Sequence, residues 1–295
     1  MTVPRETGAI HDIGYRRYDG QRLGAAYIGR SLLVHSLRGA FGLGRSARSK
    51  VMPLLLLGVM VVPALIIAAV ATLGGADELP LEYASYAVNL QVVVTIFVGA
   101  QAPQSVSRDL RFRVVALYFS RPLSRHAYVH AKLLAMSAAL FVLLAMPLLV
   151  LYVGALLAEM PFWSNTRDVA LALAGAAVFA VVLAGVGLLI AAFTPRRGIG
   201  VAAVVAVLLV LAGVSATVQG IAQEGGNDVV AGWAGLISPY SLVDGVQVSV
   251  LGAESSTAAG PPGTTGGLGF VLATIGLFAV CYGLLLLRYR RVAVG

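Results

Sequence analysis

The chain has 295 residues, of which 59% are hydrophobic and 12% charged, with a formal net charge of +8. Soluble domains carry roughly a quarter charged residues, so this composition excludes an ordinary soluble protein. The single cysteine, Cys281, excludes a disulfide framework and a multi-cysteine metal site.

The first 50 residues are polar and basic, which favours a cytoplasmic tail and not a signal peptide. Within them, the segment from Tyr27 to Phe41 alternates apolar residues with Arg30 and Arg38. That pattern predicts an amphipathic helix lying in a membrane interface. A simple basic tail beside the membrane is the alternative. We place residues 1–50 in this tail and residues 51–295 in a transmembrane domain.

Six runs of the second domain are long and apolar enough to be transmembrane helices, which need roughly 20 mostly apolar residues. They cover about 52–73, 86–106, 133–157, 169–193, 199–222 and 268–287. Pro147 should interrupt the third run. The fourth is dense in alanine and glycine, which lets helices approach closely. The predicted fold class is an all-α integral membrane protein with six transmembrane helices.

The second run carries more polar residues than the others. Polar side chains in lipid are costly, so they should face other helices or a water-filled path. Together with polar residues of the fifth run, they are the candidate substrate pathway: Gln91, Thr95, Gln101, Ser215 and Gln219. Hydrogen bonding between helices is the alternative role.

Residues 223–267 repeat apolar side chains at helical spacing around a break at Ser238 and Pro239. This pattern predicts a short broken hairpin, resembling a reentrant segment, that dips into the outer leaflet. The following GAESSTAAGPPGTTGG is predicted to be a flexible, exposed loop.

Topology follows from the basic residues, which concentrate on the cytoplasmic side of multi-pass proteins. With both termini in the cytoplasm, every Lys and Arg except Arg167 lies on the inner side. The net charge is thus an orientation signal and does not indicate nucleic-acid binding.

The chain shows no energy source of its own. The predicted spans have no Asp, Glu, Lys, Arg or His in their central parts, which argues against an ion-coupled carrier. Neither Lys50 nor Lys132 has the glycine spacing of a phosphate-binding loop, so no ATPase site is expected. His126 and His130 have the spacing of a metal pair, but without a third ligand they are interpreted as interface histidines. We therefore expect no enzyme activity, metal or cofactor in this chain.

The stretch from Arg108 to Lys132 combines basic charge with two apolar stripes. Read as a helix from Ser107, it carries Leu110, Val114, Leu117 and Tyr118 on one side, and Phe112, Val115 and Phe119 on the other. Pro122 should end this helix, and Ser124 should cap the next one. A short helix with two apolar sides needs two partners, one inside the bundle and one outside it. A loop whose arginines only fix topology is the alternative.

These features resemble the permease subunit of ATP-binding-cassette (ABC) exporters, in the type V branch with six spans per protomer. The match is carried by the basic tail, the hairpin before the last span, the alanine-rich fourth span with its PRRG turn, and above all FSRPLSR at 119–125. The opening IHDIGYRRYDGQRLG resembles the start of many actinobacterial members.

The resemblance implies a transporter of the bacterial plasma membrane, in which two permeases, identical or paralogous, join two ATPase subunits that bind ATP and Mg²⁺. It assigns Ser107–Ser120 as a cytoplasmic coupling helix seated in a groove of the ATPase. Phe112, Val115 and Phe119 would fill that groove, with Asp109, Arg111 and Arg113 pairing at its rim. Export is the expected direction. A carrier or channel working without ATP and a non-transporting membrane scaffold are the alternatives.

Overall fold

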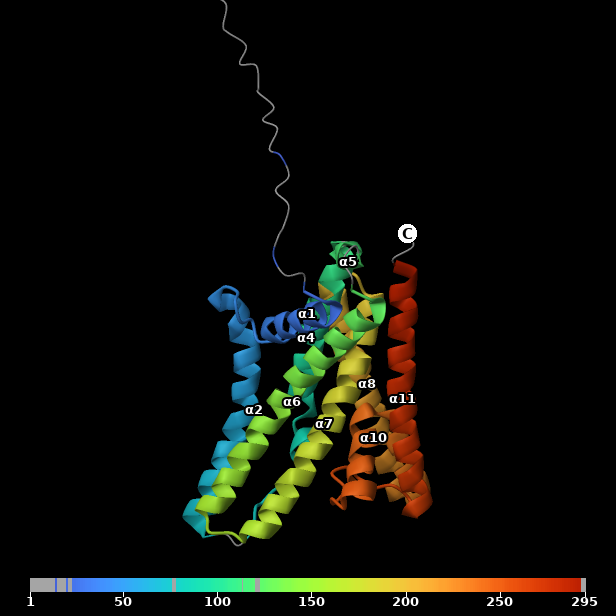
Figure 1. The fold of residues 1–295 in the computed structure, drawn as a ribbon. Coiled ribbons are helices and arrows are strands. Elements are labelled where there is room, and N and C mark those ends of the chain that lie inside the picture. Colours follow the sequence, from blue (N-terminus) through green and yellow to red (C-terminus); the bar gives the residue numbers. More distant parts are fainter. Residues whose placement is uncertain are drawn as a thin grey trace, which may run out of the picture.

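The computed structural model describes Gly14, Gly20 and residues 23–75, 78–112, 114–119 and 123–292, with only the backbone at Arg108, Val115, Ala116, Phe119 and Val292. Every regular element in these ranges is helical, and the long helices stand side by side as a bundle (Figure 1). The predicted all-α class is therefore confirmed for the described part of the chain.

Five helices are long and apolar enough to cross a membrane, which makes the chain a multi-pass membrane protein. They are α2 (Ala47–Gly74), α6 (Arg125–Leu157), α7 (Phe162–Phe193), α8 (Arg197–Glu224) and α11 (Gly263–Val292). They correspond to the first, third, fourth, fifth and sixth predicted spans. The helix α6 continues through Pro147, so the interruption predicted there is wrong. Ser124 caps α6 by accepting a hydrogen bond from the Ala127 amide at 3.1 Å, as predicted.

The second predicted span is a different kind of element. It consists of one turn, α3 (Tyr86–Asn89), followed after Leu90 by α4 (Gln91–Arg111). The helix α4 is not among those apolar enough to count as spans by composition. It packs against α6, α7 and α8, and its polar residues therefore meet protein on several sides.

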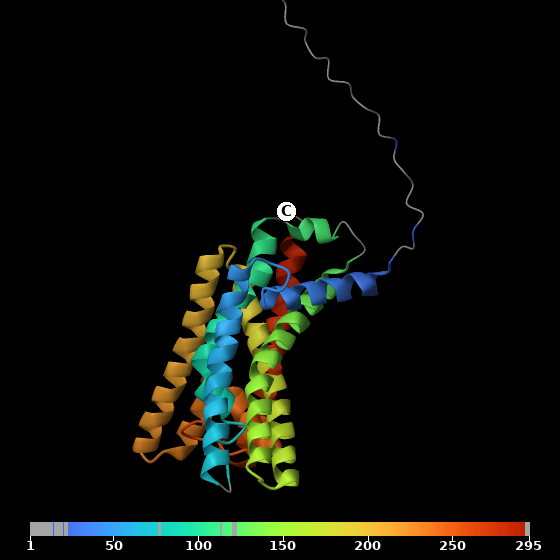
Figure 2. The same ribbon diagram turned by 90° about the vertical axis from the view of Figure 1, so that its left-hand side faces the viewer.

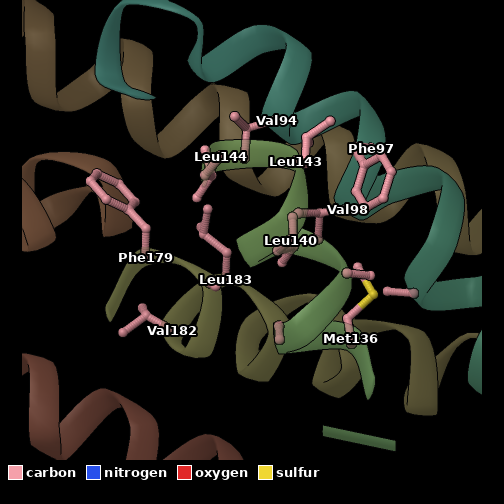
Figure 3. Packing of buried hydrophobic residues seen from close by; sticks show 14 of the residues in the cluster. Val94, Phe97, Val98, Met136, Leu140, Leu143, Leu144, Phe179, Val182 and Leu183 are labelled. Carbon is pink, nitrogen blue, oxygen red and sulfur yellow. The ribbon is translucent and has the colours of Figure 1, made fainter. Parts of the chain in front are cut away.

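The main hydrophobic core lies where α4, α6 and α7 meet (Figure 3). There Phe97 and Val98 of α4 face Leu140 of α6 and Leu183 of α7, and all four are completely buried. The α4–α7 contact needs a glycine, because a Cβ at Gly187 would collide with Val98. This bears out the close approach predicted from the small residues of the fourth run.

The helix α1 (Ala25–Ala40) lies across one end of the bundle, where it packs on α4 and α6 (Figure 2). Leu32 is buried against the core, whereas Arg30 and Arg38 are exposed. The chain then turns into α2 through Gly42 and Gly44, whose φ angles of 67° and 80° favour glycine. The predicted amphipathic helix is thus present.

Short helices gather at the opposite end: α9 (Asp228–Ala234), η1 (Gly235–Ile237), α10 (Pro239–Val246) and η2 (Gln247–Leu251). They form a bent pair with an angle of 116° at Ser238, the predicted break. Entry of this pair into a leaflet stays a prediction. The following loop was predicted to be flexible and exposed, but it is tied to the short helices. The buried Asp244 carboxylate accepts hydrogen bonds from the Ser256 amide (3.2 Å) and the Ser255 hydroxyl (3.3 Å).

The two ends of the bundle differ in charge. The end with α1 and the last turns of α11, at the top of Figures 1 and 2, holds every described Lys and Arg except Arg167; we call it the basic end. The other, the acidic end, holds all the described carboxylates except Asp109: Glu78, Glu82, Glu159, Asp168, Glu224, Asp228, Asp244 and Glu254.

Candidate functional site

The expected coupling segment at the basic end is divided into two helices. The helix α4 continues to Arg111, so Ser107 lies inside it, with its hydroxyl donating to the Ala191 carbonyl of α7 at 3.0 Å. A separate short helix, α5 (Val114–Phe119), lies across the end of the bundle (Figure 2). The prediction of a single continuous helix from Ser107 is therefore wrong. Ser120 and Pro122 lie outside the described residues.

Asp109 joins the end of α4 to the start of α6. Its Oδ2 lies 2.9 Å from Lys132 Nζ and accepts a hydrogen bond from the Tyr128 hydroxyl at 2.8 Å. Lys132 also donates to the Ser105 carbonyl at 2.8 Å. The side chains of Lys132 and Asp109 are only 8% and 17% exposed. A desolvated ion pair is tolerated when further hydrogen bonds satisfy both groups. Tyr128 supplies such a bond to Asp109, and the Ser105 carbonyl accepts one from Lys132. We call Asp109, Tyr128 and Lys132 the Asp109 cluster.

The Tyr128 ring is the packing centre of this end. It is fully buried, with its centroid 5.0 Å from that of Tyr289 on α11 and 5.8 Å from that of Tyr118 on α5. A six-residue helix is unstable alone, so α5 depends on such contacts. Burial, with a smaller contribution from Asp109, raises the pKa of Tyr118 and keeps its hydroxyl neutral.

Two apolar side chains of the described part of the coupling segment are exposed. Phe112, between α4 and α5, is 63% exposed, and Leu117 on α5 is 68% exposed. The Arg111 guanidinium lies 5.6 Å from the centre of the Phe112 ring. Of the predicted inner stripe, Leu110 and Tyr118 pack against the core, whereas Leu117 does not. Arg113 and the side chains of Val115 and Phe119 lie outside the described residues.

The structure gives Asp109 a different set of partners from the one we expected. Asp109 was expected to pair at the rim of a partner's groove, but its carboxylate is directed toward α6 within this chain. Arg111 and Phe112 are the exposed candidates that the structure describes fully.

Two of the predicted pathway residues bind the short helices of the acidic end. The Thr95 hydroxyl donates to the Gln91 carbonyl (2.7 Å), so its contact with Tyr240 of α10 (2.6 Å) has Tyr240 as the donor. Ser215 likewise donates to the Ala234 carbonyl (3.0 Å) and receives a bond from Ser241 (3.1 Å). Both Thr95 and Ser215 are buried, and their hydrogen bonds join α4 and α8 to the short helices.

The remaining pathway candidates do not converge on one space. Gln91 is half-buried at the start of α4, while Gln101 lies further along α4 and lines a cavity at the basic end. Gln219 is buried on α8 near Gly235. Thr95, Ser215 and Gln219 thus adjoin the same group of short helices, whereas Gln101 lies apart from them at the basic end.

The two histidines of α6 are exposed, and one has a defined partner. His130 stacks on Tyr282 of α11, and its Nε2 lies 2.7 Å from the Tyr282 hydroxyl. This contact gives His130 a structural role between α6 and α11.

The acidic end has a cavity of about 540 Å³ between the chain before α3, the start of α7 and η2. Glu82 and Asp168 are among its lining residues. Partial burial, followed by the nearby charges of Glu254 and Asp168, raises the pKa of Glu82.

Sequence reasoning missed Tyr128, Tyr240 and Ser241 as partners of the candidates. Only Tyr128 carried a signal, because it precedes Lys132 by one helical turn and therefore shares a face with it. The pairing of Tyr240 with Thr95 crosses 145 residues and has no local pattern.

Neither protein-family models nor curated proteins show a match to this chain. The fold and the charge distribution define a multi-pass helical membrane protein with a fixed, partly exposed element at its basic end.

Proposed function

We propose that this chain is the membrane subunit of an ABC exporter of the bacterial plasma membrane. A separate ATPase subunit would bind ATP and Mg²⁺, and its hydrolysis cycle would drive movement of a substrate outward. The proposal is carried by one observation at the basic end. Asp109 fixes the end of α4 to α6, while Phe112, three residues later, is exposed.

The charge distribution supports an orientation with the basic end in the cytoplasm. Basic residues accumulate on the cytoplasmic side of multi-pass proteins. The exposed Arg30 and Arg38 of α1 then lie at the level of lipid head groups, while the buried Leu32 faces the core. Both termini are cytoplasmic in this arrangement.

Phe112 and α5 are the proposed contact with the ATPase subunit. An exposed aromatic ring beside an arginine has the composition of an interface anchor with a charged rim. Val115, Phe119 and Arg113 complete the contact in the proposal. Movement of the partner against α5 would reach the bundle through Tyr118 and the Asp109 cluster.

The assembly we propose contains two copies of the ATPase subunit and a second permease, identical or paralogous. Large parts of α2, α8 and α11 are exposed, because only 28%, 28% and 22% of the residues in their most apolar stretches are buried. These faces have room for a second permease as well as lipid.

The test is co-purification of the tagged full chain in detergent from its native host, with mass spectrometry and an ATPase assay. The structure offers a matched control for Phe112→Ala. Phe193 ends α7 at the same basic end, is 56% exposed, and has the Arg288 guanidinium 5.5 Å from its ring centre. We expect Phe112→Ala to lose an equimolar ATPase subunit and its activity, and Phe193→Ala to retain both.

Equal retention by the two variants would remove Phe112 from the contact. Recovery of the wild-type chain alone, without ATPase activity, would contradict the proposal and favour an autonomous carrier or a membrane scaffold.

A further inference from the structure

A second cavity lies at the basic end, enclosed by α1, α4, α5 and α6. Its volume is about 330 Å³, enough for a group of several polar atoms. Ser36 lines it from α1, Arg45 from the turn after α1, Gln101 from α4 and Lys132 from α6, while Met136 and Ala135 form an apolar part of the wall. Asp109, Phe112 and Tyr118 also border it, but the proposed function assigns no ligand to this space.

Two buried polar atoms at this cavity have no hydrogen-bond partner among the described residues. They are Ser36 Oγ and Gln101 Oε1, and Gln101 is only 3% exposed. A buried polar group without a partner is costly, and nearly all such groups in folded proteins bind protein, ordered water or a ligand. The cavity is therefore suited to a molecule with hydroxyl or other polar groups.

The charges at the cavity favour an anion. Lys132 and Asp109 neutralise each other as an ion pair. Arg45 adds a positive charge, and its guanidinium lies beside Gly39 of α1. Arg197 adds another nearby, since it donates to Gln104 Oε1 at 3.1 Å and Gln104 is also a lining residue. His35 and Tyr118 are the other titratable groups of the wall.

The position of the cavity indicates which anion can reach it. The helix α1 lies across the end of the membrane bundle, and α1 itself forms one wall. With the five long helices crossing a bilayer, their ends lie near the phospholipid phosphates. A lipid also has an apolar part, which matches Met136 and Ala135.

We infer that this cavity binds the phosphate-bearing head group of an anionic phospholipid. Arg45 binds the phosphate, and Ser36 and Gln101 bind hydroxyl groups of the head group. The bound lipid then contacts α1 and α5 together, because both elements line the same cavity. This inference does not rest on the proposed transport function, since binding is measured on the chain alone.

The experiment is native mass spectrometry of the full chain purified in detergent, titrated with phosphatidylglycerol or phosphatidylcholine. Two variants alter the cavity and two matched variants do not. Arg45→Gln removes the anion contact, and Arg48→Gln makes the same change on the exposed first turn of α2. Ser36→Leu fills the cavity, and Ser31→Leu makes the same change on the exposed side of α1.

We expect one phosphatidylglycerol per chain, bound in preference to phosphatidylcholine. Arg45→Gln should weaken it about tenfold, the effect of losing one charge-assisted hydrogen bond. Ser36→Leu should abolish it, whereas Arg48→Gln and Ser31→Leu should bind as the wild type. Monodisperse gel filtration of each variant shows that it is folded.

Inorganic phosphate, added at millimolar concentration while thermal unfolding is followed, distinguishes the source of the phosphate. Stabilisation that depends on Arg45, without any lipid adduct, would overturn the lipid as ligand in favour of a soluble phosphate compound. Equal binding of the two lipids, or equal losses in Arg45→Gln and Arg48→Gln, would overturn the site itself.

Discussion

The Asp109 carboxylate of α4 and the Tyr128 hydroxyl of α6 meet at 2.8 Å, next to an ion pair between Asp109 and Lys132 at 2.9 Å. Tyr128 and Lys132 lie one turn apart on α6, so a single acid holds two consecutive turns of the neighbouring helix. The exposed Phe112 follows Asp109 by three residues, so the backbone just before it is held against α6.

Breaking the Asp109 cluster should destabilise the protein. Asp109→Asn and Lys132→Met each leave a mostly buried charge without its partner, at a cost near the lower end of the roughly 3–5 kcal/mol known for such changes. The double variant should cost less than the sum of the two. Thermal unfolding in detergent measures all three. Arg111→Gln, at an exposed position, is the control and should change stability by less than about 0.5 kcal/mol.

Arg111 and Phe112 should differ in how they affect association with the proposed ATPase subunit. Phe112→Ala removes a desolvated anchor and should weaken binding by about 2 kcal/mol or more. Arg111→Gln removes a rim charge and should lower mainly the association rate at low salt. Surface plasmon resonance at two ionic strengths separates them. A larger effect of Arg111→Gln at high salt would reverse the assignment.

Variants of the Thr95–Tyr240 hydroxyl pair can show whether Thr95 stabilises the fold or contacts a substrate. Tyr240→Phe leaves the buried Thr95 oxygen with its Gln91 bond but without a donor, which should cost about 1 kcal/mol in thermal unfolding. Thr95→Val combined with Tyr240→Phe removes both polar partners and should cost little more. If Thr95→Val instead leaves stability intact and changes only transport, a substrate contact is the better interpretation.

The contact between α4 and α7 should not tolerate a larger residue at Gly187. In Gly187→Ala the new Cβ collides with Val98, so the free energy of unfolding should fall by about 1–3 kcal/mol, as in other overpacked cores, and the melting temperature with it. Adding Val98→Ala should restore part of this loss. Gly213→Ala on α8 has no atom within 4 Å of its new Cβ and should be neutral or slightly stabilising.

Stability at the acidic end should depend on pH through Glu82. Its pKa is raised in the folded protein by burial first and then by Glu254 and Asp168. A carboxyl with a raised pKa favours folding when protonated and opposes it when ionised. Glu82→Gln should therefore melt above the wild type at neutral pH, and the difference should vanish below about pH 4, near the ordinary glutamate pKa. Glu224→Gln, exposed at the end of α8, controls for the lost charge.

Features governed by neighbouring residues could be predicted from the sequence. The cap at Ser124 acts on an amide three residues away, and the alternation around Arg30 and Arg38 is local to α1. The apolar runs mark the long helices because membrane spans must satisfy their backbone groups internally. Their ends were less accurate, since α7 begins at Phe162 and α11 at Gly263, ahead of the predicted starts.

Features set by distant contacts could not be predicted. Ser107 is held inside α4 by the Ala191 carbonyl, 84 residues away, so no local pattern indicated that α4 continues past it. The inward direction of Asp109 depends on α6 folding back beside α4. The loop containing Ser255 and Ser256 has the composition of a free loop, but the buried Asp244 holds it.

The helix α4 has a mechanical consequence for the whole molecule. Its 21 residues form a rod about 30 Å long, secured by Asp109 at one end and by Thr95 near the other. A rod secured at both ends transmits an axial push applied at α5 to Tyr240 and the short helices around it, unless it bends. Pro103, which lacks an amide hydrogen, is the weakest point along it. The stiffness of α4 around Pro103 would thus set how much of a displacement at the basic end arrives at the acidic end.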